Sequence, residues 1–334
     1  MAETADTGQS TQEIRIGLIG GSGLGQLLAA QAEGHRHEVD TPFGRPSDAI
    51  VETHWGGLPV FFLSRHGPGH VLNPSQVPYR ANLYALKQLG VTHVIASGAV
   101  GSLRDEFRPR DLVVPDQIID KTNKRPNTFF EKAAVHVEFA EPFCPVLRRI
   151  LLEEGAGLAA QGSETQTGAA ASALRVHERG CYVCMEGPAF STRAESLMHR
   201  LWGGDLIGMT AMPEAKLARE AEIGYALVAL VTDYDCWRRA DVPPRGEPHE
   251  QELQEQDPAV LLKEIIANLQ AASDNGIRLI RRAVERVAAS PADRQALLKS
   301  PALSSLRLAI WSDKSRIDKE QVELLAPVWM KYFQ

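Results

Sequence analysis

Short, almost continuously apolar runs alternate with amphipathic stretches between residue 14 and about residue 232 of the chain. Four runs have the length and continuity of strands that are buried on both faces, at residues 14–20, 59–64, 93–97 and 225–231. Three further stretches have helical periodicity, at residues 79–90, 193–203 and 213–224. This alternation predicts an α/β domain with a mostly parallel or mixed central sheet.

The pattern changes after Trp237. Residues 238–257 are rich in proline and charge and predict a loop or lid, whereas residues 258–289 predict one long amphipathic helix. Short helical patterns follow to the end of the chain, with aromatic residues that predict docking onto the domain. We therefore expect a disordered tail at 1–13, a domain at 14–290 and a helical C-terminal extension at 291–334. Residues 162–175 are of low complexity and predict a loose insertion.

Composition and charge exclude several classes of protein. The 334 residues are 44% hydrophobic and carry a formal net charge of -6, which disfavours a general nucleic-acid binder. No apolar run approaches the roughly 20 residues of a membrane helix. Four cysteines are too few for a disulfide scaffold of this size, so we expect a reducing cytoplasm. Cys181 and Cys184 have redox spacing, but a strand would point them to opposite faces, so we expect neither a redox nor a metal site.

Polar and glycine-rich segments follow the predicted strands. IGLIGGSGLG places a glycine-rich turn after the first strand, but its spacing fits neither a dinucleotide-binding nor a Walker motif. An anion site and a plain tight turn remain equal alternatives there. Arg65 and His66 follow the second run, and SGAVGSL (Ser97 to Leu103) overlaps the third. Because ligands of open α/β sheets lie at the carboxyl ends of strands, these elements together predict a phosphate site.

Asp233 and Asp235 follow the last apolar run. Two such carboxylates are often solvated turn residues. In a purine site, however, a carboxylic acid can protonate N7 of the leaving base, and a carboxylate can accept hydrogen bonds from a 6-amino group. Asparagine would suit a 6-oxopurine better, so aspartate favours adenine.

Taken in order, several motifs resemble those of the 5'-methylthioadenosine phosphorylases, in the trimeric purine nucleoside phosphorylase superfamily. They are IGLIGGSGLG, DTPFGRPSDAI, SRHGPGHVLNPSQVPYRANLYALKQLG, THVIASGAVGSL, AEPFCP, EGPAFSTRAES, IGMTAMPEAKLARE and VTDYDCW. They span about residues 14–237. The resemblance implies one α/β domain with a central mixed, partly barrel-like sheet flanked by helices. It also implies a homotrimer that splits 5'-methylthioadenosine with phosphate as co-substrate, with no metal and no organic cofactor.

The resemblance also assigns roles to residues of this chain. Phosphate would be bound by Ser22, Arg65, His66, Gly98, Ala99 and Thr210. The purine would be bound by Phe190, Ser191, Asp233 and Asp235, with Asp233 as the catalytic acid. Met209 would lie against the ribose, and His136 would reach across a trimer interface to cover the methylthio group of a neighbour's substrate.

The chain departs from the family pattern in three places. Gly98 stands where threonine is usual, and Ala189 stands where arginine is usual. The part beyond about Pro243 matches poorly and is longer than the family needs. Three alternatives therefore stay open: the same chemistry on adenosine or on a 6-oxopurine such as inosine, guanosine or methylthioinosine; a catalytically impaired nucleoside-binding protein; and a nicotinamide oxidoreductase, which the failed glycine spacing disfavours.

Overall fold

The computed structural model describes residues 13–21, 34–165, 174–238 and 258–334. Within them the strands are β1 (Ile16–Gly20), β2 (His35–His37), β3 (Ile50–Trp55), β4 (Leu58–Ser64), β5 (His93–Ser102), β6 (Leu112–Val113), β7 (Gln117–Lys121), β8 (Val176–His177), β9 (Cys181–Met185), β10 (Leu206–Gly208) and β11 (Gly224–Asp233). The α-helices are α2 (Tyr79–Gln88), α3 (Pro145–Thr165), α4 (Arg193–Leu201), α5 (Ala211–Glu220), α6 (Pro258–Ala289), α7 (Pro291–Leu298), α8 (Lys319–Leu324) and α9 (Ala326–Trp329).

The strands of these described segments form one 11-stranded mixed sheet that branches at β5. The main path runs β2-β3-β4-β1-β5-β10-β9-β7, and β11 pairs with β5 and with β6. The first part of β5 lies parallel to β1, while Gly101 and Ser102 pair antiparallel with β10. One long strand thus carries two sets of neighbours. The sheet is mixed, partly barrel-like and flanked by helices, which confirms the predicted fold class.

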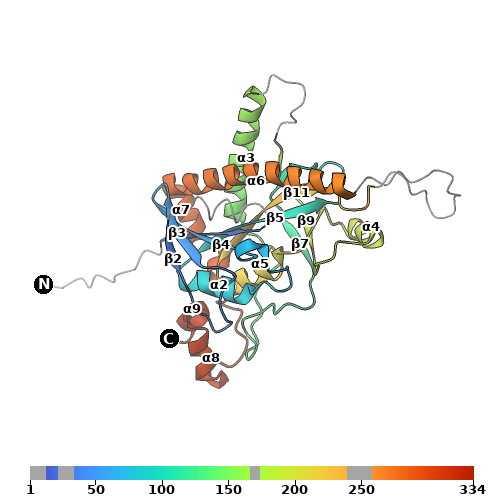
Figure 1. Cartoon of the computed structure of the whole chain (residues 1–334). Helices are drawn as coiled ribbons and strands as arrows, with labels where there is room; N and C mark the ends of the chain where they lie inside the picture. Colours follow the sequence, from blue (N-terminus) through green and yellow to red (C-terminus); the bar gives the residue numbers. More distant parts are fainter. Residues whose placement is uncertain (1–12, 22–33, 166–173, 239–257) are drawn as a thin grey trace.

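Helices cover both faces of the sheet (Figure 1), with α3 and α6 on one side and α2 and α5 on the other. Side chains along β11 alternate between the two layers: Ala226 and Val228 pack toward α3 and α6, whereas Leu227 and Ala229 pack toward α2 and α5. A strand that is buried on both faces must be apolar at every position. This explains why β1, β4, β5 and β11 were predictable as apolar runs.

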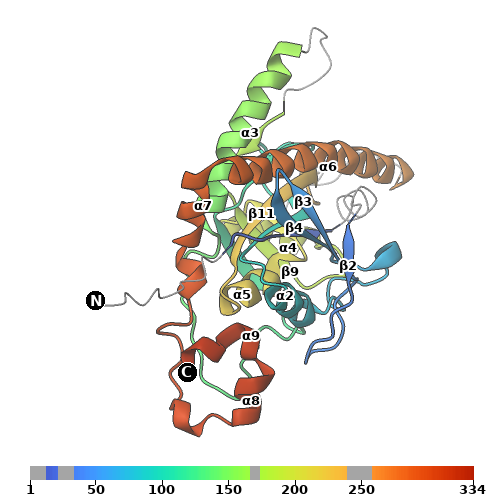
Figure 2. The same ribbon diagram turned by 90° about the vertical axis from the view of Figure 1, so that its left-hand side faces the viewer.

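The C-terminal extension packs against the domain rather than standing apart from it (Figure 2). The Trp329 side chain is 1% exposed and lies against Phe130, with ring centroids 4.9 Å apart. The Tyr84 hydroxyl donates to the carbonyl oxygen of Leu324 (2.7 Å), and Glu222 binds Lys331. The predicted docking through aromatic residues is therefore seen in the structure.

The predicted helix at 258–289 coincides with α6, and the predicted helices at 79–90, 193–203 and 213–224 appear as α2, α4 and α5. Helix α3 continues to Thr165, so the first residues of the predicted insertion are helical. The predicted lid at 238–257 lies almost wholly outside the described residues, as does most of the predicted tail. None of the helices that the structure describes is long and apolar enough to cross a membrane.

Candidate active site

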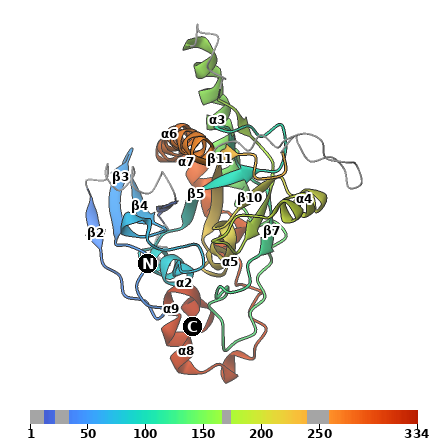
Figure 3. The same cartoon turned by 45° about the vertical axis from the view of Figure 1, so that its right-hand side comes forward.

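Strands β4, β5 and β11 lie in the central sheet (Figure 3), and β1 pairs in parallel with both β4 and β5. Since β5 and β11 are also parallel, the carboxyl ends of these four strands lie at one edge of the sheet. β1 and β4 run in parallel until Gly20 faces Ser64, and β11 follows β5 until Asp233 faces Gly101. Because the strands are parallel, the segments that follow them emerge side by side. Their register brings the predicted anion-binding and base-binding elements to the same edge.

Arg65 follows β4 and is completely buried. Its Nε and Nη2 both donate to the carboxylate of Glu214 (2.8 Å each), and its Nη1 donates to the carbonyl oxygen of Ser97 (2.8 Å). Burial acts to lower the pKa of Arg65, but the facing Glu214 outweighs it and holds the pKa above its ordinary value. The guanidinium is therefore a fixed positive charge beneath this edge.

The first glycine-rich turn approaches this guanidinium closely. A side chain at Gly21 would place its Cβ 2.7 Å from Arg65 Nη1 and 3.3 Å from the carbonyl oxygen of Ser97. Only glycine fits so near, which gives the sequence motif a structural reason. Ser22, predicted to bind phosphate, lies outside the described residues.

His66 is a neutral imidazole in the folded chain. Burial, with the adjacent charge of Arg65, lowers its pKa to about 4. Its Nδ1 lies 2.8 Å from the carbonyl oxygen of Leu72. A carbonyl only accepts, so Nδ1 carries the hydrogen and Nε2 presents a lone pair. His66, predicted to bind phosphate, thus presents an acceptor in the chain without a bound anion.

Gly98 and Thr210 meet at the same place. A Cβ at Gly98 would lie 3.3 Å from Thr210 Oγ1, and Thr210 is the N-cap residue of α5. Its backbone N–H points to the hydroxyl of Tyr182 (3.4 Å). Ala99 lies one residue further along β5, opposite Leu230. The predicted phosphate residues that the structure describes therefore cluster around Arg65 and the start of α5.

Arg125 holds the loops that carry Met209 and the EGPAF segment. Its Nη1 donates to the carbonyl oxygens of Met209 and Met212 (2.6 Å each), and its Nη2 donates to that of Glu186 (2.5 Å). Burial acts to raise the pKa of Glu186, but the hydrogen bonds that it accepts outweigh burial and lower it to about 2. Arg125 thus holds the backbone of Met209, the predicted ribose contact, in place.

The two carboxylates after β11 have different surroundings. Asp233 Oδ1 accepts the backbone N–H of Asp235, and its Oδ2 lies 2.7 Å from Thr232 Oγ1. Asp235 Oδ2 is buried without a hydrogen-bond partner. Burial, together with the charge of Asp233, raises the pKa of Asp235. The negative charge of Asp233 thus disfavours the charged form of Asp235.

Phe190 and Ser191 lie in the turn before α4. The Phe190 side chain is 85% exposed in the single chain, so it does not line an enclosed pocket there. The Ser191 carbonyl oxygen accepts from the Cys236 thiol (3.3 Å), which ties this turn to the segment of the acidic pair. Helix α4 then starts with a capping box between Thr192 and Glu195.

His136 is exposed and lies against Trp311 of the C-terminal extension, with ring centroids 4.6 Å apart. The strand-like pairing of Val135 with Ile310 fixes the two segments to each other. The Trp311 side chain is 71% exposed. The partners of its hydrogen bond and ring contact thus belong to the C-terminal extension, and no such contact among the described residues joins His136 to another predicted site residue.

Cys181 and Cys184 lie in β9, and burial raises the pKa of both thiols, to about 11 and about 12. High thiol pKa values disfavour redox reactivity and metal binding. Within the described ranges, no three His, Cys, Asp or Glu side chains are grouped to hold a metal.

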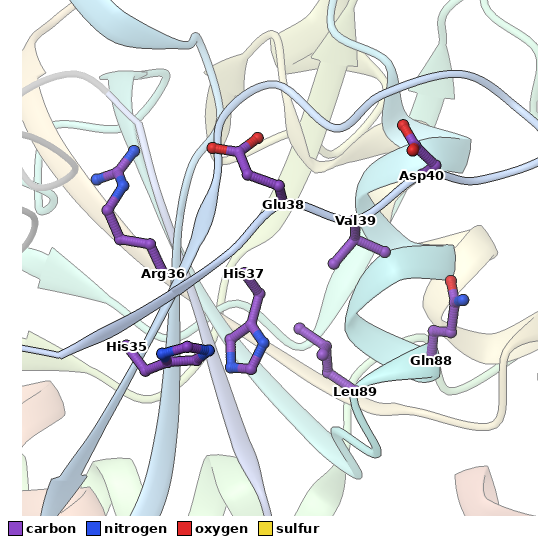
Figure 4. A pocket seen from close by; sticks show the side chains of 8 residues that line it. All are labelled: His35, Arg36, His37, Glu38, Val39, Asp40, Gln88 and Leu89. Carbon is purple, nitrogen blue, oxygen red and sulfur yellow. The ribbon is translucent and has the colours of Figure 1, made fainter.

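A surface recess of about 490 Å³ lies beside β2 and is lined by polar residues such as His35, Arg36 and Asp40 (Figure 4). It shares no residue with the predicted site. Its lining combines positive and negative side chains, and His37 is already paired with Glu52 (2.7 Å). It therefore offers no second cradle for an anion.

Two groups of positioning residues were missed from the sequence. Glu214 had one available indication, since it is a single carboxylate in the otherwise apolar stretch TAMPEA. Arg125 and Glu186 had none, because each lies in a polar segment that resembles any surface loop. Their importance is visible only from burial.

Comparison with known proteins shows the class to which this fold and site belong. The model of the phosphorylase superfamily matches residues 15–285, and the chain belongs to this superfamily. Within it, the S-methyl-5'-thioadenosine phosphorylase of Gloeobacter violaceus is 45% identical over 325 residues, which cover 97% of both chains. The enzyme of that name from Geobacter sulfurreducens is 45% identical over 312 residues, covering 93% of this chain and 96% of the relative.

Solved structures agree. A methylthioadenosine phosphorylase from an antarctic soil metagenomic library aligns with a TM-score of 0.77 at 42% identity, covering 95% of this chain and 99% of that one. The methylthioadenosine phosphorylase of Schistosoma mansoni, in complex with adenine, aligns with a TM-score of 0.73 at 34% identity, covering 90% and 99%. The resemblance inferred from the motifs is confirmed. The expectation that the C-terminal part exceeds what the family needs is wrong, because the Gloeobacter relative is matched over 97% of both chains.

Proposed function

We propose that the chain splits the N-glycosidic bond of 5'-methylthioadenosine with phosphate, giving adenine and 5-methylthioribose 1-phosphate. The observation that carries this is that the cluster around the buried Arg65 and the carboxylates of Asp233 and Asp235 lie at the same edge of the sheet. The chain is also 45% identical to an enzyme of that name. The reaction is a pentosyl transfer to phosphate. Its residues need no metal and no organic cofactor.

The proposed mechanism starts with phosphate held by Arg65, His66, Thr210 and backbone N–H groups near Gly98. One phosphate oxygen bonds to C1' as the bond from C1' to N9 breaks, and the electron pair stays on the base. The phosphate dianion stabilises the positive charge that develops on the sugar. Met209 orients the ribose through its backbone.

The acidic pair neutralises the departing base. Asp233 delivers to N7 a proton that the pair holds, and the neighbouring carboxylate of Asp235 accepts from the 6-amino group of adenine. Burial and the charge of Asp233 raise the pKa of Asp235, which favours a proton on this side of the base site. Phe190 and Ser191 border the base from the turn before α4.

The defining experiment measures adenine release from 5'-methylthioadenosine with and without phosphate. Asp233→Asn should lower kcat/KM at least about 100-fold, the usual size of an acid–base contribution, while Asp40→Asn, on the surface beside Arg45, should not. Intact turnover in Asp233→Asn would remove the acid role. Faster release from inosine or guanosine would favour a 6-oxopurine enzyme, and no phosphate-dependent release would favour a nucleoside-binding protein.

We also propose a homotrimer in the cytoplasm. The exposed pair of His136 and Trp311, and the exposed Phe190 near the acidic pair, are supporting features, because large exposed aromatic side chains are typical of contact surfaces. In the trimer, His136 covers the methylthio group bound by a neighbour. The four cysteines are free thiols, which supports a reducing compartment. Light scattering in solution tests the assembly.

A further inference from the structure

Three buried polar atoms without hydrogen-bond partners belong to the first residues of α4 and the segment after β11. They are Arg193 Nε, Ser196 Oγ and Asp235 Oδ2. Nearly all buried polar groups in folded proteins are hydrogen-bonded, so each exception needs a reason. The hydrogen bond from the Cys236 thiol to the Ser191 carbonyl oxygen (3.3 Å) ties the two segments together, so a rearrangement on ligand binding can make two of these atoms partners of each other.

Ser196 is fixed on the first turns of α4. Its side chain is completely buried, and its backbone N–H donates to the Thr192 carbonyl oxygen (2.9 Å). Thr192 and Glu195 close a capping box around the same turn, with the Glu195 N–H donating to Thr192 Oγ1 (3.2 Å). The hydroxyl of Ser196 can rotate, but its oxygen is held in place.

Asp235 is fixed from the other side. Its backbone has a φ of 50°, and its N–H donates to Asp233 Oδ1 (2.7 Å). A Cβ at Gly101 would lie 3.3 Å from the Cβ of Asp235, and since glycine has no Cβ, Asp235 lies directly against the backbone of β5. The carboxylate therefore has little freedom apart from rotation about its own bonds.

The two groups influence each other. Burial raises the pKa of Asp235, and the negative charges of Asp233 and Glu195 add to the rise. The Ser196 hydroxyl and the Cys236 backbone N–H act in the opposite direction. A hydroxyl that lowers the pKa of a carboxylic acid does so by donating to its charged form.

Arg193 supplies the positive charge on this side of the site. Its guanidinium acts to lower the pKa of the Cys236 thiol, which burial nevertheless raises. Among the residues that the structure describes, the charged and titratable groups that act on Asp235 are therefore Asp233, Glu195 and Cys236, and Arg193 acts on the thiol.

We infer that Ser196 is a positioning residue for base recognition, whose hydroxyl donates to Asp235 Oδ2 when the purine is bound. This would leave Oδ1 of Asp235 free to accept from the 6-amino group, and would fix the plane of the carboxylate relative to the base. The inference rests on the proposed phosphorolysis, and it adds a hydroxyl on α4 to a base site otherwise built by the turn before α4 and the end of β11.

The test compares Ser196→Ala with Ser273→Ala. Ser273 lies in α6 and is also completely buried with an unpartnered hydroxyl, so it is a matched control. Because neither hydroxyl has a hydrogen-bond partner in the structure, neither substitution leaves another group unpaired. Both variants should therefore melt at or slightly above the wild-type temperature. Only Ser196→Ala should lower kcat/KM, by about tenfold, the loss of one hydrogen bond to a charged group.

A pH profile separates positioning from packing. Without the Ser196 hydroxyl the charged carboxylate is less stabilised in the purine complex, so the alkaline limb of kcat, which reports groups of that complex, should move up by about half a pH unit. Wild-type kcat/KM and an unshifted limb in Ser196→Ala would overturn the inference. So would lower activity accompanied by a lower melting temperature and an unshifted limb.

Adenine affinity, measured by calorimetry, gives the same comparison without turnover. It should weaken about tenfold in Ser196→Ala and stay unchanged in Ser273→Ala. If the wild-type protein binds adenine but releases none from nucleosides with phosphate, the proposed function fails while this comparison still decides the role of Ser196. Equal adenine affinity in all three proteins would overturn it.

Discussion

Replacing Glu214 by Gln removes the charge that faces Arg65 without changing the volume of the side chain. Both side chains are completely buried, and two hydrogen bonds of 2.8 Å join them. Gln offers one acceptor where the carboxylate offers two, and its amide hydrogens face the guanidinium. The Tyr225 hydroxyl, which donates to Glu214 Oε1 (2.8 Å), also faces a poorer acceptor. The variant leaves a buried positive charge without a counter-charge.

The expected cost is about 3–5 kcal/mol, the usual result of removing one partner of a buried ion pair. For a chain of this size that corresponds to a fall in Tm on the order of 5–10 °C. The matched control is Glu285→Gln, because Glu285 and Arg281 form a pair (3.2 Å) whose side chains are about half exposed. Removing that charge should cost about 0–1 kcal/mol.

Urea unfolding at one fixed protein concentration measures both variants, so that assembly contributes equally. A loss in Glu214→Gln of less than about 1 kcal/mol, equal to that in the control, would refute the reasoning, because the buried pair would then behave as a surface pair. The double replacement Arg65→Met with Glu214→Leu should recover at least half of the lost stability. It should also abolish phosphate-dependent turnover, which separates the charge needed for binding from the packing needed for folding.

Two further predictions concern other parts of the chain. Gly98→Thr should lower the KM for phosphate about 5- to 10-fold, since its hydroxyl restores one donor to an anion. Among the described residues, its Cβ would meet only Thr210 Oγ1, at 3.3 Å. An equal effect of Gly98→Ala, which lacks the hydroxyl, would contradict this. Burial raises the pKa of Glu220 to about 7, against the hydrogen bonds that it accepts from Phe129 and Thr128. The folded chain therefore holds this proton more tightly than the unfolded chain, and the stability that protonation supplies is complete below pH 4.5 and is lost as the pH rises through about 7. Glu220→Gln should remove a fall on the order of 3 kcal/mol from the urea-unfolding profile, and parallel profiles of the two proteins would rule this out.

The sequence predicted β1, β4, β5 and β11 because each of these strands is buried on both faces and therefore forms a continuous apolar run. Arg65, His66, Asp233 and Asp235 were found because strand ends are where an α/β sheet presents polar side chains. The structure brings these four to one edge, as expected from parallel pairing. Their partners were not predictable, because a pair such as Arg65 and Glu214 is separated by 149 positions.

β3, β7 and β10 were not predicted, and the short strands β2, β6 and β8 were also missed. Each of the latter three has two or three residues, too few for an alternating pattern to be recognised. The tautomer of His66 could not be predicted either, because it depends on the Leu72 carbonyl oxygen, which the following turn brings back to the ring. Sequence patterns predict which chemical groups are present, whereas protonation depends on contacts.

The lone pair of His66 has a consequence for which anions this site accepts. In the chain without a bound anion, the ring donates from Nδ1 to Leu72 and presents Nε2 as an acceptor. It can therefore bind an oxyanion through a proton that the anion carries, or by taking up a proton itself, which the anion's charge favours. Hydrogen phosphate and hydrogen arsenate carry such a proton at neutral pH, whereas sulfate of nearly the same size and shape carries none. An anion without a proton can bind this nitrogen only after the ring has taken up a proton, so its binding should weaken with rising pH more steeply than that of hydrogen phosphate.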